Sequence, residues 1–207
     1  MIRISAVLAA ILFFLLPAVA KPLTVLALGD SLTAGYGLAP AEAFPVKLEA
    51  ILRAKGYDIT VVNGGVSGDT AADGLARLDW SLSDEVGAVI VELGANDALR
   101  GLPPGQAEAA LDGIMARLAE MKIPALIAGM RAPPNMGPDY VADFDGMYAR
   151  LAAKYDAILY PFFLDGVAAD PALNQADGMH PNPKGADIIV SRILPSVEQL
   201  IAKAAGK

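Results

Sequence analysis

The sequence contains no cysteine, and this absence excludes several kinds of chemistry together. Without cysteine there is no disulfide bond, no zinc–thiolate site, no cysteine nucleophile and no cysteine to carry a lipid. Histidine occurs once, at position 180, so a metal site built from several histidines is excluded too. Only a site made of acidic oxygen ligands stays open, and we expect no bound metal.

A surplus of basic residues is also lacking. The chain has 16 Lys and Arg against 23 Asp and Glu, a formal net charge of −7, which argues against nucleic-acid binding. With 55% hydrophobic and 19% charged residues, the composition is typical of a globular protein. A chain of 207 residues is long enough for one domain with a sizeable core, and no repeat or second domain is visible.

The first 20 residues differ from the rest of the chain. Arg3 is their only charged residue, residues 6–20 are apolar throughout, and the run ends in the small-x-small sequence Ala-Val-Ala. This pattern predicts a secretory signal peptide over residues 1–20, removed before Lys21. The alternative is a membrane anchor, but the run is shorter than the ~20 apolar residues of a span. We therefore expect a mature chain of residues 21–207 in the periplasm or outside the cell.

Beyond residue 21, short apolar runs alternate with helical patterns. The predicted strands are 23–28, 59–62, 88–93, 125–130 and 157–160, and the predicted helices are 45–55, 71–82, 106–121, 140–154 and 184–204. Segments 32–40, 99–104, 131–139 and 161–176 are expected to be irregular. The strands are almost continuously apolar, as expected when helices cover both faces of a sheet. The pattern predicts an α/β fold, a flavodoxin-like three-layer α/β/α sandwich with a five-stranded parallel sheet.

Polar clusters follow three of these strands. They are residues 29–31 (Gly-Asp-Ser), 67–69 (Ser-Gly-Asp) and 94–97 (Gly-Ala-Asn-Asp). Because parallel strands end at one edge of a sheet, we expect the three clusters to converge there. A fourth cluster, Asp177 and His180, precedes the last helix and can join them if its loop crosses the same edge.

The residue types in these clusters suit acyl transfer. A serine hydroxyl needs a neighbouring base to act as a nucleophile, and imidazole suits that task near neutral pH. A carboxylate on the other ring nitrogen fixes the tautomer. Ser31, His180 and Asp177 fit these three roles. The backbone N–H groups of Ser31 and Gly68 and the side-chain amide of Asn96 fit the donors of an oxyanion hole.

Each of these residues also has a structural interpretation. An isolated serine such as Ser31 usually caps a helical turn, and Gly68 fits a tight turn. Asn96 could bind a loop backbone, and Asp177 could close an Asx-turn. His180 could be a surface histidine or a core histidine with its hydrogen bonds satisfied. One residue type at one position does not decide between these interpretations.

Two further points stay open at the level of single residues. Ser67 also follows a strand, so it rivals Ser31 as a nucleophile. Asp30, Asp69 and Asp97 are expected to be structural, because backbone hydrogen bonds and helix N-termini account for carboxylates at such positions.

The four clusters together, in this order, resemble the blocks of the SGNH hydrolases, also called the GDSL family. Residues 29–32 (Gly-Asp-Ser-Leu) resemble the first block, Gly68 the second and residues 94–97 the third, and residues 177–181 resemble the block of Asp-x-x-His-Pro. The resemblance implies that Ser31, rather than Ser67, is the nucleophile. It also implies oxyanion donors at Gly68 and Asn96 and a triad completed by His180 and Asp177.

Residues 67–70, 74–78, 91–97 and 99–101 are similar to the bacterial periplasmic thioesterase I/protease I/lysophospholipase L1 subfamily. That resemblance implies hydrolysis of esters and thioesters without a cofactor. It also implies a substrate-binding loop beside the acyl groove, formed by Leu99, Arg100, Gly101 and Leu102.

We therefore expect an exported, monomeric serine ester hydrolase that acts on a small-molecule or lipid acyl ester or thioester. The alternatives are a carbohydrate acetylesterase and a catalytically inactive binding module on the same fold.

Overall fold

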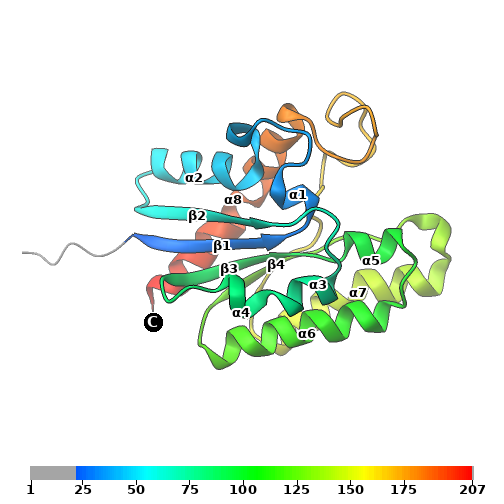
Figure 1. The fold of residues 1–207 in the computed structure, drawn as a ribbon, viewed down its shortest axis with the longest axis horizontal. Coiled ribbons are helices and arrows are strands. Elements are labelled where there is room, and N and C mark those ends of the chain that lie inside the picture. The colour runs from blue at the N-terminus through cyan, green and yellow to red at the C-terminus, as the bar shows by residue number, and fades with distance from the viewer. Residues whose placement is uncertain (1–21, 207) are drawn as a thin grey trace, which may run out of the picture.

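The computed structural model describes residues 22–206, so the predicted signal peptide lies outside the described residues. Its strands are β1 (Leu23–Gly29), β2 (Ile59–Gly65), β3 (Val86–Glu92), β4 (Ala125–Ala128) and β5 (Ile158–Tyr160). They form one sheet in the order β2-β1-β3-β4-β5, and every neighbouring pair is parallel. This is the flavodoxin-like strand order, so the predicted fold class is confirmed (Figure 1).

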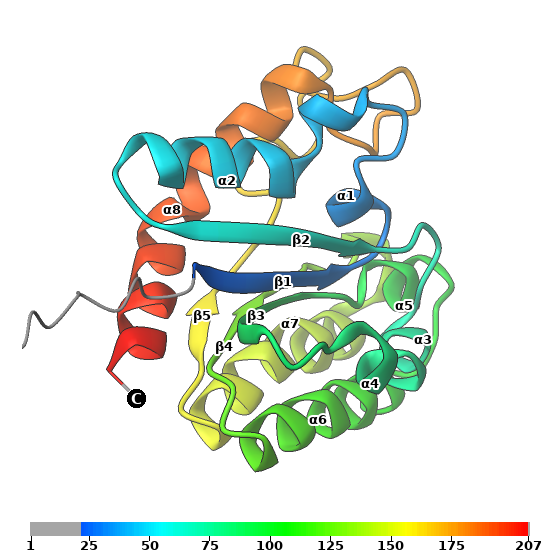
Figure 2. The ribbon, with the colours of Figure 1, turned by 60° about the vertical axis from the view of Figure 1, so that its left-hand side comes forward.

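Helices form a layer on each side of the sheet (Figure 2). One layer contains α1 (Ser31–Ala34), α2 (Phe44–Ala54) and α8 (Pro183–Ala205). The other contains α3 (Ala71–Ala76), α4 (Leu78–Ser81), α5 (Ala95–Leu99), α6 (Pro104–Glu120) and α7 (Pro138–Lys154). Because both faces are covered, the central strands are buried throughout most of their length, as their apolar sequences require.

Two of the predicted elements were wrong in detail. The helix expected over residues 71–82 is divided into α3 and α4 at Arg77, whose backbone leaves the helical geometry. At this break the Arg77 guanidinium donates to the Gly29 carbonyl oxygen at 2.9 Å and to Ser81 Oγ at 3.2 Å. Residues 32–40 were expected to be irregular, yet Leu32 to Ala34 belong to α1. A helix of four residues is too short to leave a periodic pattern in the sequence.

The first turn of α3 is closed by side chains of its own segment. Thr70 is its N-cap, and Thr70 and Asp73 form a reciprocal capping box.

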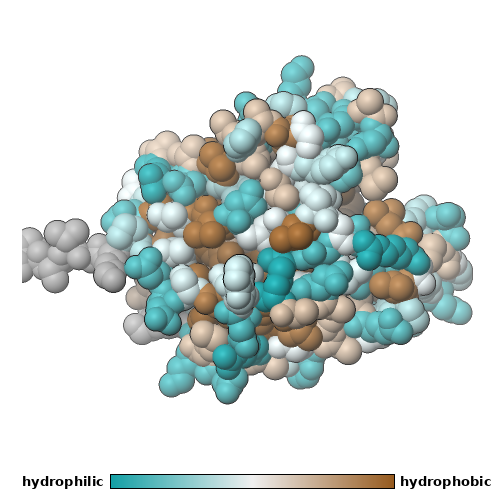
Figure 3. All heavy atoms as spheres, viewed as in Figure 1, coloured by the Kyte–Doolittle hydropathy of each residue, from teal (hydrophilic) through white to brown (hydrophobic). Residues whose placement is uncertain are grey.

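No helix within residues 22–206 is long and apolar enough to cross a membrane. On the face seen in Figure 3, apolar side chains lie in small separate patches among hydrophilic ones.

Candidate active site

The turn after β1 presents Ser31 at the carboxyl edge of the sheet. Asp30 caps α1, since its Oδ1 accepts the backbone N–H of Leu32 at 2.9 Å, and Ser31 is the first residue of that helix. There is almost no free space behind the turn. A Cβ atom on Gly29 would lie 2.1 Å from Thr33 Oγ1. A Cβ atom on Gly65 would lie 2.2 Å from the Ala34 nitrogen. Glycine at both strand ends therefore lets α1 pack directly against the sheet.

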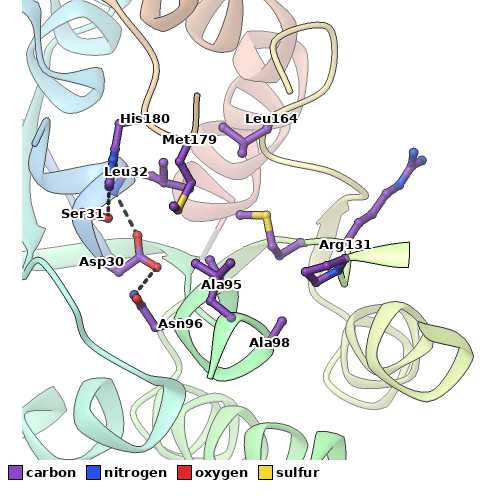
Figure 4. A pocket seen from close by; sticks show the side chains of 13 residues that line it. Asp30, Ser31, Leu32, Ala95, Asn96, Ala98, Arg131, Leu164, Met179 and His180 are labelled. Carbon is purple, nitrogen blue, oxygen red and sulfur yellow. Dashed lines mark hydrogen bonds between the residues drawn. The ribbon is translucent and has the colours of Figure 1, made fainter. Parts of the chain in front are cut away.

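His180 and Asp177 reach Ser31 from the segment before α8. Figure 4 shows His180 above Ser31, and His180 Nε2 lies 3.0 Å from Ser31 Oγ. On the other side of the ring, His180 Nδ1 lies 2.7 Å from Asp177 Oδ2. The three residues thus form a continuous chain of hydrogen bonds.

The Asp177 carboxyl also organises its own loop. Its Oδ1 accepts the backbone N–H groups of Met179 at 2.9 Å and His180 at 3.0 Å. These backbone hydrogen bonds, together with the bond to the ring, lower the pKa of Asp177 to about 2. The carboxyl is therefore ionised at neutral pH and can only accept. Hence the hydrogen lies on Nδ1 of the ring, and Nε2 faces the serine hydroxyl as an acceptor.

Gln175 and Tyr36 hold this loop against the segment that follows α1. The Gln175 side-chain amide donates to the carbonyl oxygens of Tyr36 at 2.7 Å and Pro181 at 3.0 Å. The Gln175 N–H donates to the His180 carbonyl oxygen at 2.8 Å. The Tyr36 ring packs on the imidazole, with ring centroids 4.7 Å apart. The orientation of His180 is therefore set from two directions.

Asn96 connects the turn after β1 with the turn after β2. Its Nδ2 donates to Asp30 Oδ2 at 3.1 Å and to the Asp69 carbonyl oxygen at 2.9 Å, so both amide hydrogens have an acceptor. Asp30 is completely buried, and burial raises its pKa to about 6. The Asp30 carboxyl thus connects Asn96 with the backbone of the helix that carries Ser31.

Gly68 lies in the turn between β2 and α3 in a left-handed conformation, with φ +92°. Its carbonyl oxygen accepts a hydrogen bond from Arg100 Nη2 at 2.6 Å. Asp69, the next residue, accepts from Asn96 through its carbonyl and from Arg77 Nε through its carboxyl at 2.6 Å. Gly68 therefore directly precedes a residue that Asn96 binds, although it does not line the pocket described next.

A pocket of about 180 Å³ opens beside Ser31, His180 and Asn96. Most of its other lining is apolar: Leu32, Ala95, Ala98, Leu99, Met130, Pro133, Leu164 and Met179. Arg131 also lines it, but its side chain points away, and the guanidinium lies 4.7 Å from the Phe162 ring (Figure 4). The pocket therefore offers an apolar space next to a hydroxyl and an imidazole.

Of the four residues that the sequence suggested for substrate binding, the pocket includes Leu99. Arg100 instead binds the Gly68 carbonyl, and the Leu102 carbonyl oxygen accepts the Tyr140 hydroxyl at 2.8 Å. Gly101 lies between them with φ +63°.

Met130, Pro133 and Leu164 line the pocket but were not among the site residues predicted from the sequence. They follow β4 and β5. Ligands of parallel sheets bind beyond the carboxyl ends of the strands, so the same signal was present after these two strands.

Within residues 22–206, no group of three or more His, Cys, Asp or Glu side chains is arranged to hold a metal ion.

Comparison with known proteins adds an independent finding. The model of the GDSL-like Lipase/Acylhydrolase family matches residues 27–188. An arylesterase of Vibrio mimicus is 39% identical over 176 residues, which are 84% of this chain and 88% of that protein. The thioesterase 1/protease 1/lysophospholipase L1 of Escherichia coli K12 is 37% identical over 179 residues, 86% of this chain and 85% of that protein.

A solved structure gives the same result for the fold. The crystal structure of AlinE4, an esterase of the SGNH-hydrolase family, superposes with a TM-score of 0.74 at 48% identity. The superposition covers 88% of this chain and 98% of AlinE4.

Proposed function

Because the chain belongs to the GDSL-like lipase/acylhydrolase family and is an ester hydrolase by that membership, we propose that it acts by two-step acyl transfer through Ser31. The observation that carries this proposal is the chain of hydrogen bonds from Asp177 through His180 to Ser31, beside an apolar pocket. A serine hydroxyl next to an oriented imidazole is the arrangement that nucleophilic catalysis requires.

In the first step, Ser31 Oγ attacks the acyl carbon and its proton moves to His180 Nε2. The tetrahedral intermediate then collapses, and the leaving alcohol or thiol takes the proton from His180. In the second step, water gives a proton to His180 and attacks the acyl-enzyme, which releases the acid and regenerates the serine hydroxyl. Asp177 stays ionised throughout and stabilises the imidazolium that forms in each step.

We assign the oxyanion hole to the backbone N–H groups of Ser31 and Gly68 and to the side-chain amide of Asn96. Asn96 supports this assignment because it lines the pocket beside Ser31. Both of its amide hydrogens already have acceptors, on Asp30 and Asp69. Donation to the oxyanion therefore requires that Asn96 share one of these hydrogen bonds with the substrate.

The proposed substrate is a small-molecule or lipid acyl ester or thioester. The apolar lining supports an acyl chain in the pocket. Of the charged residues in the lining, Asp30 belongs to the turn that carries Ser31, and the Arg131 side chain points away from the pocket. The names of the two relatives, an arylesterase and a thioesterase, support both bond types. Leu99 contributes to the acyl pocket, and residues 100–102 shape the loop behind it.

We further propose that residues 1–20 direct export and that residues 21–207 form one monomeric hydrolase domain in the periplasm or outside the cell. Mass measurement of the exported protein checks this: a chain that begins at Lys21 is expected, and a retained N-terminal segment contradicts it.

The experiment that tests the function measures kcat and KM of residues 21–207 on p-nitrophenyl esters from acetyl to long acyl chains. Ser31→Ala should lower kcat by about 10⁶-fold, because the covalent step is removed. It should also abolish labelling by an organophosphonate probe. Ser67→Ala is the matched control, because this exposed serine also follows a strand, and it should keep full activity.

Retained activity in Ser31→Ala would contradict the assignment. A steep preference for acetyl esters would favour the acetylesterase alternative, and no turnover at any chain length would favour the inactive binding module.

A further inference from the structure

One buried acidic group has no role in the mechanism above. Glu92 is the last residue of β3, and it is completely buried at the end of a strand that is otherwise apolar. Its partner in the register of the sheet is Gly29, the residue that begins the nucleophile turn. A Cβ atom on Gly29 would lie only 2.7 Å from Glu92 Oε2. The carboxyl thus fills the space directly behind the turn that carries Ser31.

The hydrogen-bonding neighbours of this carboxyl belong to the segment that carries Ser31. Thr33 Oγ1, itself fully buried, donates to Glu92 Oε2 at 2.7 Å. The backbone N–H groups of Asp30 and Thr33 also act on the carboxyl and favour its charged form. Ser31 lies between these two residues. Through the Thr33 hydroxyl, Glu92 therefore binds the helix whose first residue is Ser31.

Burying the Glu92 carboxyl at this position costs free energy. Burial, and then the neighbouring Asp30 carboxyl, raise the pKa of Glu92 well above its usual value, so its neutral form is favoured. Its second oxygen, Oε1, has no hydrogen-bond partner within the described part of the chain. An apolar residue of similar size is often as stable or more stable at a buried polar site. Buried polar groups without full hydrogen bonding occur mainly at functional sites in natural proteins. The position of Glu92 therefore suggests a role for the neighbouring turn that carries Ser31.

We propose that Glu92 is a positioning residue for the reaction at Ser31, acting through Thr33 and the backbone of the nucleophile turn. Its carboxyl keeps the first turn of α1 in place, so that Ser31 Oγ stays 3.0 Å from His180 Nε2. This inference rests on the proposed function, because it needs Ser31 to be the nucleophile. Glu92 itself touches no substrate, since it does not line the pocket.

The test compares a conservative with a disruptive change at each end of the contact. Glu92→Gln keeps an oxygen that accepts from Thr33, and it should retain kcat within about threefold. Glu92→Leu leaves the Thr33 hydroxyl without its acceptor and should lower kcat by about 10–100-fold, since small misplacements of a reacting group cost up to about 100-fold. KM should change by less than about twofold, because the acyl pocket is untouched.

The Thr33 variants give the second arm. Thr33→Val should lower kcat by about tenfold, and Thr33→Ser, which keeps the hydroxyl, should restore it. The double variant Glu92→Leu/Thr33→Val should lose no more activity than Glu92→Leu alone, because both changes break the same contact. If Glu92→Leu does not fold, the Thr33→Val and Thr33→Ser pair decides the question.

Glu49 offers a matched control. Its carboxyl also joins a helix to a strand, since Glu49 Oε2 accepts the Val61 N–H at 2.7 Å, but it lies on α2 away from the pocket. Glu49→Leu should lower stability to denaturant without changing kcat. The rate at which an organophosphonate labels Ser31 should fall in parallel with kcat in Glu92→Leu and stay unchanged in Glu49→Leu.

Three results overturn the inference: a parental kcat in folded Glu92→Leu, a parental kcat in Thr33→Val, or failure of Thr33→Ser to restore activity. These differ from failure of the proposed function itself, which is read from Ser31→Ala. If Ser31→Ala remains active, both proposals fall, whereas a dead Ser31→Ala with a fully active Glu92→Leu overturns only the positioning role.

Discussion

The two sides of the Ser31–His180 hydrogen bond are held by different kinds of structure. Ser31 is held from within, by a turn whose neighbours Asp30, Thr33 and Glu92 are completely buried. His180 is held from outside, by a loop whose hydrogen bonds are local and partly exposed to solvent. The turn that carries Ser31 is thus fixed by packing against the sheet, whereas the loop that carries His180 is fixed by the hydrogen bonds of Asp177 and Gln175 and by the Tyr36 ring.

The difference between the two regions changes the pKa of their carboxyl groups, Asp30 and Asp177, in opposite directions. Burial raises the pKa of Asp30 to about 6, whereas hydrogen bonds from backbone N–H groups and the histidine ring lower the pKa of Asp177 to about 2. Burial gives a precise position but disfavours charge, and an exposed loop allows charge with less packing. A nucleophile needs position above all, and the partner of an imidazolium needs a permanent negative charge.

After Ser31→Ala, the largest effect is expected at Asp177. Asp177→Asn should lower kcat by about 10⁴-fold, because a neutral amide no longer sets the ring tautomer or stabilises the imidazolium. Its oxygen can still accept the backbone N–H groups of Met179 and His180, so the loop should keep its shape. Asp170→Asn is the control, since Asp170 also accepts a backbone N–H in this segment, from Ala172 at 2.8 Å. Similar losses in both variants would mean that the loop, not the charge, matters.

The next largest effect is expected at Asn96, which connects the turn after β1 with the turn after β2. Asn96→Ala should lower kcat by about 10²–10³-fold with little change in KM, as expected for the loss of one oxyanion donor. Steady-state kinetics on a single p-nitrophenyl ester measures both constants. A rise in KM with an unchanged kcat would assign Asn96 to substrate positioning instead.

A pair of glycine variants compares the packing of the two regions directly. Gly29→Ala would force a Cβ to 2.1 Å from Thr33 Oγ1 and should lower the free energy of unfolding by about 3 kcal/mol. Gly178→Ala, between Asp177 and His180, meets no atom within 4 Å and should cost about 1 kcal/mol for its left-handed φ of +70°. Urea unfolding measures both values. Equal losses, or a larger loss at Gly178, would contradict the contrast between the regions.

The two regions should also differ in how their stability depends on pH. Folded Asp30 keeps its proton up to about pH 6, whereas in the unfolded chain it releases it near 3.8. The native state therefore binds more protons between these values, and the free energy of unfolding should fall by about 2 kcal/mol as pH rises from 4 to 6. Asp30→Asn should remove this fall, which urea unfolding at several pH values would detect as a difference that grows with pH.

Asp177 should behave in the opposite way. Because its pKa is lowered to about 2, its contribution to stability is present above pH 4 and is lost as pH falls toward 2. The same unfolding series on Asp177→Asn checks this sign. A loss of stability for Asp177 in the window between pH 4 and 6 would contradict the local hydrogen bonds as its cause.

The sequence predicted the elements that depend on neighbouring residues. Each of the five strands lies within a few residues of its expected position, because apolar runs are a local property of the sequence. The division of the helix at Arg77 could not be seen, because that guanidinium binds the Gly29 carbonyl, 48 residues away.

For the candidate site, the sequence pointed to Ser31, His180 and Asp177, and the structure brings them within hydrogen-bond distance of one another. Their catalytic roles stay predictions until the variants above are measured. The same holds for Gly68 and Asn96. What the sequence did not indicate is that Asp30 and Asp69 engage both hydrogens of the Asn96 amide.

By itself, the sequence determined which chemistry is available: a serine, a single histidine and a carboxylate, with no cysteine to offer another nucleophile. It also determined the alternation of strands and helices, since both follow from the chain's local pattern. Only the tertiary structure decided which apolar side chains, such as Met130 and Leu164, line the pocket, and which buried acid, Glu92, lies behind the turn that carries Ser31. Such contacts join residues that are far apart along the chain, and distances between them exist only once the sheet has formed.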